Sequence, residues 1–269
     1  MSEPSKIFEL STIKSILLLL GAYTFSFCLG LTFHETGHAL AYLIVGVSNI
    51  EIHVHPFALS YCSHGFRPTE VLPFTGCMGP LFNILCSSII TLAVWRKRNP
   101  KLLPLLMCAG TAFLAEGVAI FMDIADLPLL TDWGKVIIIG GISPIIMGII
   151  GALFLAIGST IMLLLLPLVN VSSNDSFWRR VLISIGFILY FTMSVIYVSI
   201  FDINVLDNRL IALFSAIGFN FLLMALYKPI FPFLDRISHT DTSIVNWSAI
   251  AIAFGSALTI IVIDLVFFY

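Results

Sequence analysis

Long apolar runs alternate with short polar joints along the chain. The runs cover residues 12–46, 74–95, 102–122, 142–169, 181–201, 210–227 and 245–268. Each is long enough for a helix to cross a hydrocarbon core of about 30 Å. Charged residues make up only 10% of the chain, against about 25% in soluble domains. The pattern predicts an all-α polytopic integral membrane protein with seven transmembrane helices, and six as the main alternative.

The first apolar run and the segment after it each have an unusual feature. A helix over residues 12–46 would be about 52 Å long. It must therefore tilt, protrude from the bilayer or break, with Gly30 as the candidate break. Residues 50–57 then alternate apolar and polar side chains, which is the period of a strand. We expect a short β-like element between the first two helices.

Charged residues indicate the orientation of the helices and the class of partner. With a cytoplasmic N-terminus, ten of the thirteen lysine and arginine residues fall on the cytoplasmic side, as the positive-inside rule requires. Seven crossings then place the C-terminus on the opposite side. The net charge is −2 and the chain has no basic tail, so no nucleic acid partner is expected. The expected surroundings are the lipid bilayer.

A metal-site signature lies inside the first apolar run. Residues 34–38 read HETGH. Positions i and i+4 share one face of a helix, so His34 and His38 can offer two imidazoles to one Zn²⁺ ion. Glu35 is the candidate general base for zinc-activated water. Each ionisable residue in a membrane helix costs about 2.5 to 3.5 kcal/mol on insertion scales, so these three require compensating partners.

A hydrolytic zinc site needs a third protein ligand, and a carboxylate is a suitable one. The first and third predicted helices run in the same direction, so their C-terminal ends share a membrane side. The end of the third helix and the joint after it carry Asp123, Asp126 and Asp132. The second helix begins on this side too. The sequence therefore predicts that the candidate chemistry converges on one face of the membrane.

These motifs together resemble the site-2 protease family of intramembrane zinc metalloproteases. The resemblance rests on HETGH in a membrane helix, on Gly79-Pro80-Leu-Phe-Asn83, and on a proline-containing stretch that ends in Asp132-Trp-Gly134. It covers about residues 25–150. It implies that Asp132 is the third zinc ligand and that the β-like element lies near the active site, where it can pair with an extended substrate.

The match departs from the family's pattern after the third helix. The family reads Asn-x-x-Pro followed by Asp-Gly. In this chain Asp126 stands at the asparagine position, and Trp133 separates Asp132 from Gly134. Asp126 and Asp123 therefore stay open as alternative ligands.

Residues 1–170 form the predicted metalloprotease-like core, and residues 171–269 add further transmembrane helices. The expected function is hydrolysis of peptide bonds in membrane protein substrates, with Asn83 binding the exposed substrate backbone or steadying the site. The alternative is a membrane transporter or metal-handling protein that uses the same buried polar residues for binding. Glu116 and Asp264 lie within other predicted helices, where protonation on burial is an adequate alternative to a functional role.

Overall fold

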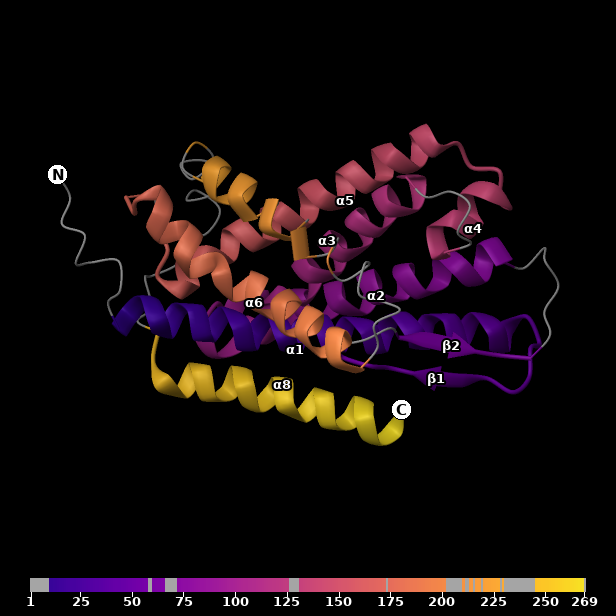
Figure 1. Cartoon of the computed structure of the whole chain (residues 1–269), viewed down its shortest axis with the longest axis horizontal. Coiled ribbons are helices and arrows are strands. Elements are labelled where there is room, and N and C mark those ends of the chain that lie inside the picture. The colour runs from indigo at the N-terminus through magenta and orange to yellow at the C-terminus, as the bar shows by residue number, and fades with distance from the viewer. Residues whose placement is uncertain are drawn as a thin grey trace.

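A computed structural model of the chain describes residues 10–57, 60–65, 72–125, 131–172, 174–201 and 245–268, and parts of the segment 210–229 (210, 213–214, 216–218, 220–227 and 229). Its helices, shown in Figure 1, are α1 (Leu10–Ile44), α2 (Leu72–Val94), α3 (Leu103–Ala125), α4 (Asp132–Ile138), α5 (Pro144–Leu165), α6 (Phe177–Phe201) and α8 (Trp247–Phe267). Strands β1 (Glu51–His53) and β2 (Tyr61–Ser63) lie between α1 and α2.

Within the described residues, six helices are long and apolar enough to cross a membrane. They correspond to six of the seven predicted runs. The remaining run, residues 210–227, lies partly outside the described residues, and its described part includes the helical residues 220–227. Large apolar side chains such as Leu92, Ile145 and Phe267 are exposed on the outer surface, where lipid replaces water as the solvent. The predicted all-α polytopic membrane fold is confirmed.

α1 is the central helix of the bundle. It runs unbroken for 35 residues and contacts α2, α3, α6 and α8, as Figure 1 shows. The suggested break at Gly30 is wrong. Instead, the missing side chain leaves room for Asn83, whose Oδ1 would lie 3.2 Å from a Cβ at position 30. Because α1 is longer than a hydrocarbon core of about 30 Å, it must tilt or protrude.

Glycines allow α3 and α5 to pack closely. Gly110 and Gly117 on α3 and Gly151 and Gly158 on α5 all lie at this contact. A Cβ at Gly158 would lie 2.8 Å from Leu114 Cγ, 2.9 Å from Leu114 N and 3.0 Å from Gly110 O. Small residues are a common means of close helix packing in membranes. The contact fixes α3 against α5 on the side away from α1.

The short helix α4 is held in place by its apolar face. Its buried side chains pack in a small core with α3 and α5, formed by Ile120, Trp133, Val136, Ile137 and Met147. Asp132 is the first residue of α4. This small core therefore determines where the Asp132 carboxylate lies.

The predicted β-like element is present, although it is shorter than the alternating segment 50–57. β1 pairs antiparallel with β2, with Ile52 opposite Cys62. After β1 the chain bonds to the C-terminal helices instead. The Val54 N–H donates to the carbonyl of Phe268 (3.0 Å), and the Ser194 hydroxyl of α6 donates to the carbonyl of Phe57 (2.7 Å). These long-range bonds replace strand pairing.

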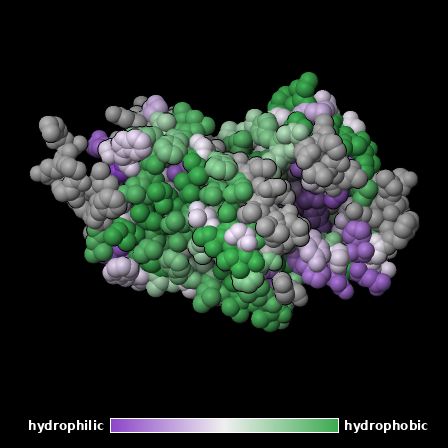
Figure 2. Space-filling view, in the orientation of Figure 1, coloured by the Kyte–Doolittle hydropathy of each residue, from purple (hydrophilic) through white to green (hydrophobic). Residues whose placement is uncertain are grey.

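Polar residues gather at one end of the bundle. Figure 2 shows hydrophobic residues over most of this face of the molecule and a hollow lined by hydrophilic residues toward the end where α4 and the hairpin lie. The C-terminal part of α1, with the HETGH motif, extends to the same end. The fold thus places the predicted site residues at the same end of the bundle.

Gly158→Ala is expected to destabilise the fold, because the new methyl group would overlap backbone atoms of α3 that cannot move independently. Overpacking of this kind costs about 1–3 kcal/mol. Gly148→Ala is the matched control on α5, since a Cβ there would meet only Ile124 Cδ1, at 3.9 Å. Thermal unfolding in detergent should show a lower Tm for Gly158→Ala alone. Equal Tm values for the two variants would contradict the close contact.

Candidate metal centre

The two histidines of the HETGH motif face the same point. His34 and His38 lie one turn apart on α1, so their side chains share a face of the helix. Their Nε2 atoms are 3.1 Å apart. Gly79 of α2 permits this arrangement, because a Cβ at that position would overlap the ring of His38. Close packing of α2 on α1 therefore fixes where the His38 imidazole lies.

Asp132 brings a third donor atom to this point. Its Oδ2 lies 2.9 Å from His34 Nε2 and 3.2 Å from His38 Nε2. The parity of the helices predicts this meeting between the end of α1 and the joint after α3. Among the described residues, His34, His38 and Asp132 are the group whose potential ligand atoms, all within 4.8 Å of one another, could hold a metal ion.

The electrostatics of this group favour an ionised Asp132. Burial alone would raise the pKa of its carboxyl, but hydrogen bonds with His34 and His38 outweigh burial and hold that pKa well below its usual range. Lys135 Nζ pairs with the other carboxylate oxygen, Oδ1, at 3.2 Å. The lysine leaves Oδ2 directed at the two imidazoles.

The second nitrogen of each imidazole is also engaged. His38 Nδ1 lies 2.7 Å from the carbonyl oxygen of Thr75 on α2, and His34 Nδ1 lies 3.1 Å from Oε1 of Glu116 on α3. A carbonyl can only accept a hydrogen bond, so His38 Nδ1 must carry the proton. Its Nε2 then has a free lone pair when the ring is neutral. Partners of this kind orient histidines toward metals in proteins.

Three acceptor atoms therefore meet at one point. With both rings neutral and protonated on Nδ1, each Nε2 presents a lone pair toward the other and toward the Asp132 oxygen. Such a set is stable only with positive charge at its centre. That charge comes either from additional protons on the imidazoles or from a metal ion bound by all three atoms.

Glu116 is the residue whose contacts sequence reasoning missed. Besides His34, its carboxylate accepts hydrogen bonds from Asn83 Nδ2 (3.2 Å) and from Trp133 Nε1 (3.3 Å). It links α1, α2, α3 and α4. The signal in the sequence was a carboxylate within an otherwise apolar helix, which indicates a partner without naming it.

Asp123, one of the alternative ligands, has a different position. Its Oδ2 accepts hydrogen bonds from the backbone amides of Trp133 (3.0 Å) and Gly134 (3.2 Å). It therefore caps the first turn of α4, where helix amides have no partner of their own. This contact holds the helix that carries Asp132. Asp126, the other alternative, lies outside the described residues.

Asn83, the predicted substrate-binding residue, lies beside this network. It is buried, its Nδ2 donates to Glu116, and its Oδ1 accepts from the hydroxyl of Ser87 at 3.2 Å. Both ends of its amide therefore have partners within the protein. Of the two roles considered for Asn83, this geometry favours steadying the site.

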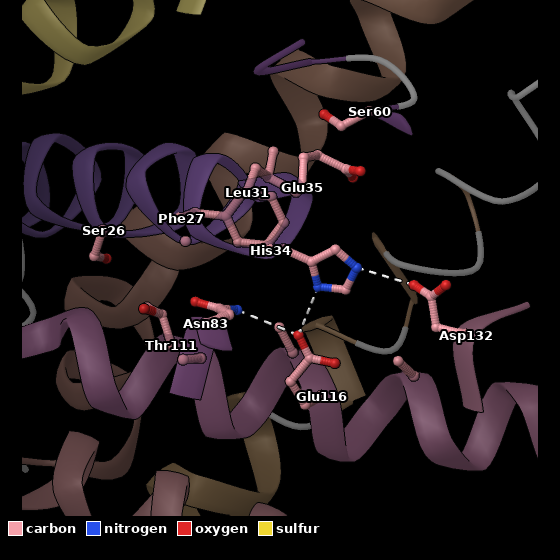
Figure 3. A pocket seen from close by; sticks show the side chains of 14 residues that line it. Ser26, Phe27, Leu31, His34, Glu35, Ser60, Asn83, Thr111, Glu116 and Asp132 are labelled. Carbon is pink, nitrogen blue, oxygen red and sulfur yellow. Dashed lines mark hydrogen bonds and ion pairs between the residues drawn. The ribbon is translucent and has the colours of Figure 1, made fainter. Parts of the chain in front are cut away.

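A cavity of about 260 Å³ adjoins the donor atoms. Figure 3 shows Glu35 on the side of Ser60, with His34 between Glu116 and Asp132. Glu35 is 4% exposed. Among the described residues its carboxylate has no hydrogen-bond partner. Glu35, the candidate base, is therefore buried in the same cavity as the donor atoms. It forms no hydrogen bond with Glu116, Thr75 or Lys135, the residues that orient those atoms.

The other histidines near this end belong to the hairpin region. His53 lies 3.6 Å from the carboxylate of Glu51 and stacks on Tyr61. His55 Nε2 lies 3.0 Å from the Tyr197 hydroxyl. Neither is part of the group that could hold a metal ion.

The donor set consists of two imidazole nitrogens and one carboxylate oxygen, oriented by a backbone carbonyl and a second carboxylate. Glu35, whose carboxylate has no hydrogen-bond partner among the described residues, follows the ligand candidate His34 on α1. Comparison of the chain with protein-family models, with curated proteins and with solved structures found no match.

Proposed function

We propose that this chain is a zinc-dependent intramembrane endopeptidase that cleaves membrane-embedded substrates, in keeping with its resemblance to the site-2 protease family. The spacing of the three donor atoms carries the proposal: they lie 2.9, 3.1 and 3.2 Å apart. Tetrahedral zinc with ligand distances of about 2.0 to 2.1 Å needs donor atoms about 3.3 Å apart. His34, His38 and Asp132 therefore fit Zn²⁺ with little movement.

The groups behind the ligands support this proposal. Glu116 and the Thr75 carbonyl engage the Nδ1 atoms, which directs both Nε2 lone pairs to the same point. Lys135 engages Asp132 Oδ1, which favours binding through Oδ2 alone. Three protein ligands are also the number found in catalytic zinc sites, where a fourth position is kept for water or substrate.

Glu35 is the proposed general base. Bound Zn²⁺ would supply Lewis-acid chemistry that activates water and polarises a peptide carbonyl. Glu35 adjoins His34 on α1 and is buried in the lining of the same cavity. Its carboxylate can accept a proton from water and transfer it to the leaving amine.

The surroundings of the site suit a membrane-embedded substrate. The cavity is lined mainly by α1 and α3, which are long and apolar enough to cross a membrane. A transmembrane substrate helix must unwind before its amides are accessible. An extended segment can then pair through its backbone with a strand such as β1 or β2. Ser60, from the same hairpin, lines the cavity.

A transporter or metal-handling protein is the second candidate. The observation in its favour is Asp264 on α8, which is fully buried against α1. Its Oδ1 accepts a hydrogen bond from Thr32 at 2.7 Å, and its Oδ2 has no partner among the described residues. Intramembrane carboxylates of this kind are typical of ion and proton pathways. Glu35 separates the two candidates, because a transporter tolerates glutamine at that position.

Elemental analysis of detergent-purified protein should find about one zinc per chain. His38→Ala and Asp132→Ala each remove a donor atom and should abolish this zinc. Asp123→Asn keeps an oxygen for the α4 amides and should retain it. His53→Ala removes a histidine outside the group and is the control. Zinc that persists in Asp132→Ala, or that is absent from folded wild type, would contradict the proposed ligand set.

Glu35→Gln should slow peptide hydrolysis by at least about 100-fold, because general-base catalysis is lost, while zinc content stays unchanged. The assay uses a mixed set of synthetic transmembrane peptides in detergent, with products identified by mass spectrometry. Glu51→Gln, at an exposed position of β1, is the control. Cleavage at the wild-type rate by Glu35→Gln would refute the proposed mechanism and favour the transporter.

Glu116→Gln should weaken zinc binding by about 10- to 100-fold, as loss of an outer partner of a ligating histidine does. Zinc content at saturating concentration should remain normal, because the three donor atoms are intact. Competition with a chelating dye measures the affinity, with Glu51→Gln again as control. An unchanged affinity would show that Glu116 does not position His34.

A further inference from the structure

The cavity at the metal centre continues away from the donor atoms between α1 and α3. Ser26 and His34 are separated by about 12 Å along α1 at 1.5 Å per residue. Figure 3 shows Ser26 and Thr111 at one end of the view and Asp132 at the other. The inner arm is the part lined by Ser26, Phe27, Gly30, Thr111, Ala112 and Ala115.

The far end of the inner arm is formed by buried residues, and its near end adjoins the metal centre. Ser26, Thr111 and Ala112 are at most 3% exposed. At the near end the lining continues into His34 and Glu116, which belong to the site itself. One ligand can therefore occupy the inner arm and reach the donor atoms at the same time.

The walls of the inner arm are apolar in effect, although they include two hydroxyl groups. The Ser26 hydroxyl donates to the carbonyl of Tyr23 at 3.1 Å. The Thr111 hydroxyl donates to carbonyls one turn back on its own helix, at 2.9 and 3.1 Å. Each hydroxyl proton is thus engaged within its helix. The remaining walls are glycine, alanine and an aromatic ring, so an apolar ligand meets no unpaired donor.

The size of the cavity suits one side chain. Its volume of about 260 Å³ spans the metal centre as well as the inner arm, and an apolar cavity of roughly 150 Å³ is enough to hold benzene. The cavity therefore accommodates a group of leucine to phenylalanine size beside a backbone segment at the metal. Ala112 and Ala115 take up little of this space because their side chains are small.

We propose that the inner arm is a specificity pocket that accepts one apolar side chain, of leucine to phenylalanine size, from the substrate residue next to the bond that is cleaved. Ala112 sets the depth of the pocket. This inference rests on the proposed zinc endopeptidase function. It explains how a site rich in charged groups selects a substrate segment from an apolar environment.

Hydroxamates test the pocket without requiring a known substrate, because the hydroxamate group binds zinc and its acyl chain probes the adjacent space. Acetohydroxamate, 4-methylpentanohydroxamate and 3-phenylpropanohydroxamate are titrated into zinc-loaded protein in lipid nanodiscs by calorimetry. The two longer compounds should bind at least about 10-fold more tightly than acetohydroxamate, because they bury additional CH₂ groups.

Ala112→Leu should remove this gain by filling the inner arm, while zinc content and acetohydroxamate affinity stay at wild-type values. Ala93→Leu, which adds the same side chain at an exposed position of α2, should keep the gain. If Ala112→Leu does not fold, Ala112→Val serves in its place and should reduce the gain most for the phenyl compound.

The outcomes separate the pocket from the function on which it rests. Tight acetohydroxamate binding without a gain for the longer compounds overturns the pocket alone. A gain that survives in Ala112→Leu also overturns it, because the acyl chain then lies elsewhere. Absence of zinc and of hydroxamate binding in the wild type overturns the endopeptidase function, and the pocket with it.

Discussion

The position of His34 on the central helix, with its ring partly buried among α1, α3 and α4, is the constraint on which the rest of the site depends. An ionisable ring inside an apolar bundle is costly unless both of its nitrogens have partners. Glu116 on α3 engages Nδ1, and Asp132 on α4 engages Nε2. Glu116 is itself buried and Asp132 is partly buried, so each carboxylate also needs partners. Asn83 and Trp133 therefore donate to Glu116, and Lys135 pairs with Asp132. The network extends outward from one ring until every charge in it has a partner.

Close helix packing makes this network geometrically achievable. Hydrogen bonds between side chains on neighbouring helices require backbones that approach closely, and small residues permit that approach. Gly79 accommodates the His38 ring, and Gly30 leaves room for the Asn83 amide. Glycine lowers intrinsic helix stability by about 1 kcal/mol relative to alanine. In these helices the contacts that glycine allows offset that cost.

The sequence predicts those features that depend on local pattern. Apolar runs locate the membrane helices, the HETGH spacing places two imidazoles on one face of α1, and helix parity brings Asp132 to the same end. Features that depend on tertiary contacts cannot be predicted from local pattern. Sequence spacing does not distinguish Asp123 from Asp132, because the difference lies in which one meets the free amides of α4. The short β1 strand likewise reflects bonds from Val54 and Phe57 to distant residues, which outweigh local alternation.

A polar network and an apolar arm share one cavity, and this combination bears on the choice between the two candidate functions. A site that only passes ions across the bilayer requires polar groups along its path. The inner arm is instead lined at its far end by the buried residues Ser26 and Thr111, whose hydroxyl protons are engaged within their own helices. An ion gains nothing by entering such a space, whereas an apolar side chain does. The shape and polarity of the cavity therefore favour a ligand with one polar, reactive part at the donor atoms and one apolar part beyond them. A peptide segment with a large apolar side chain meets that description.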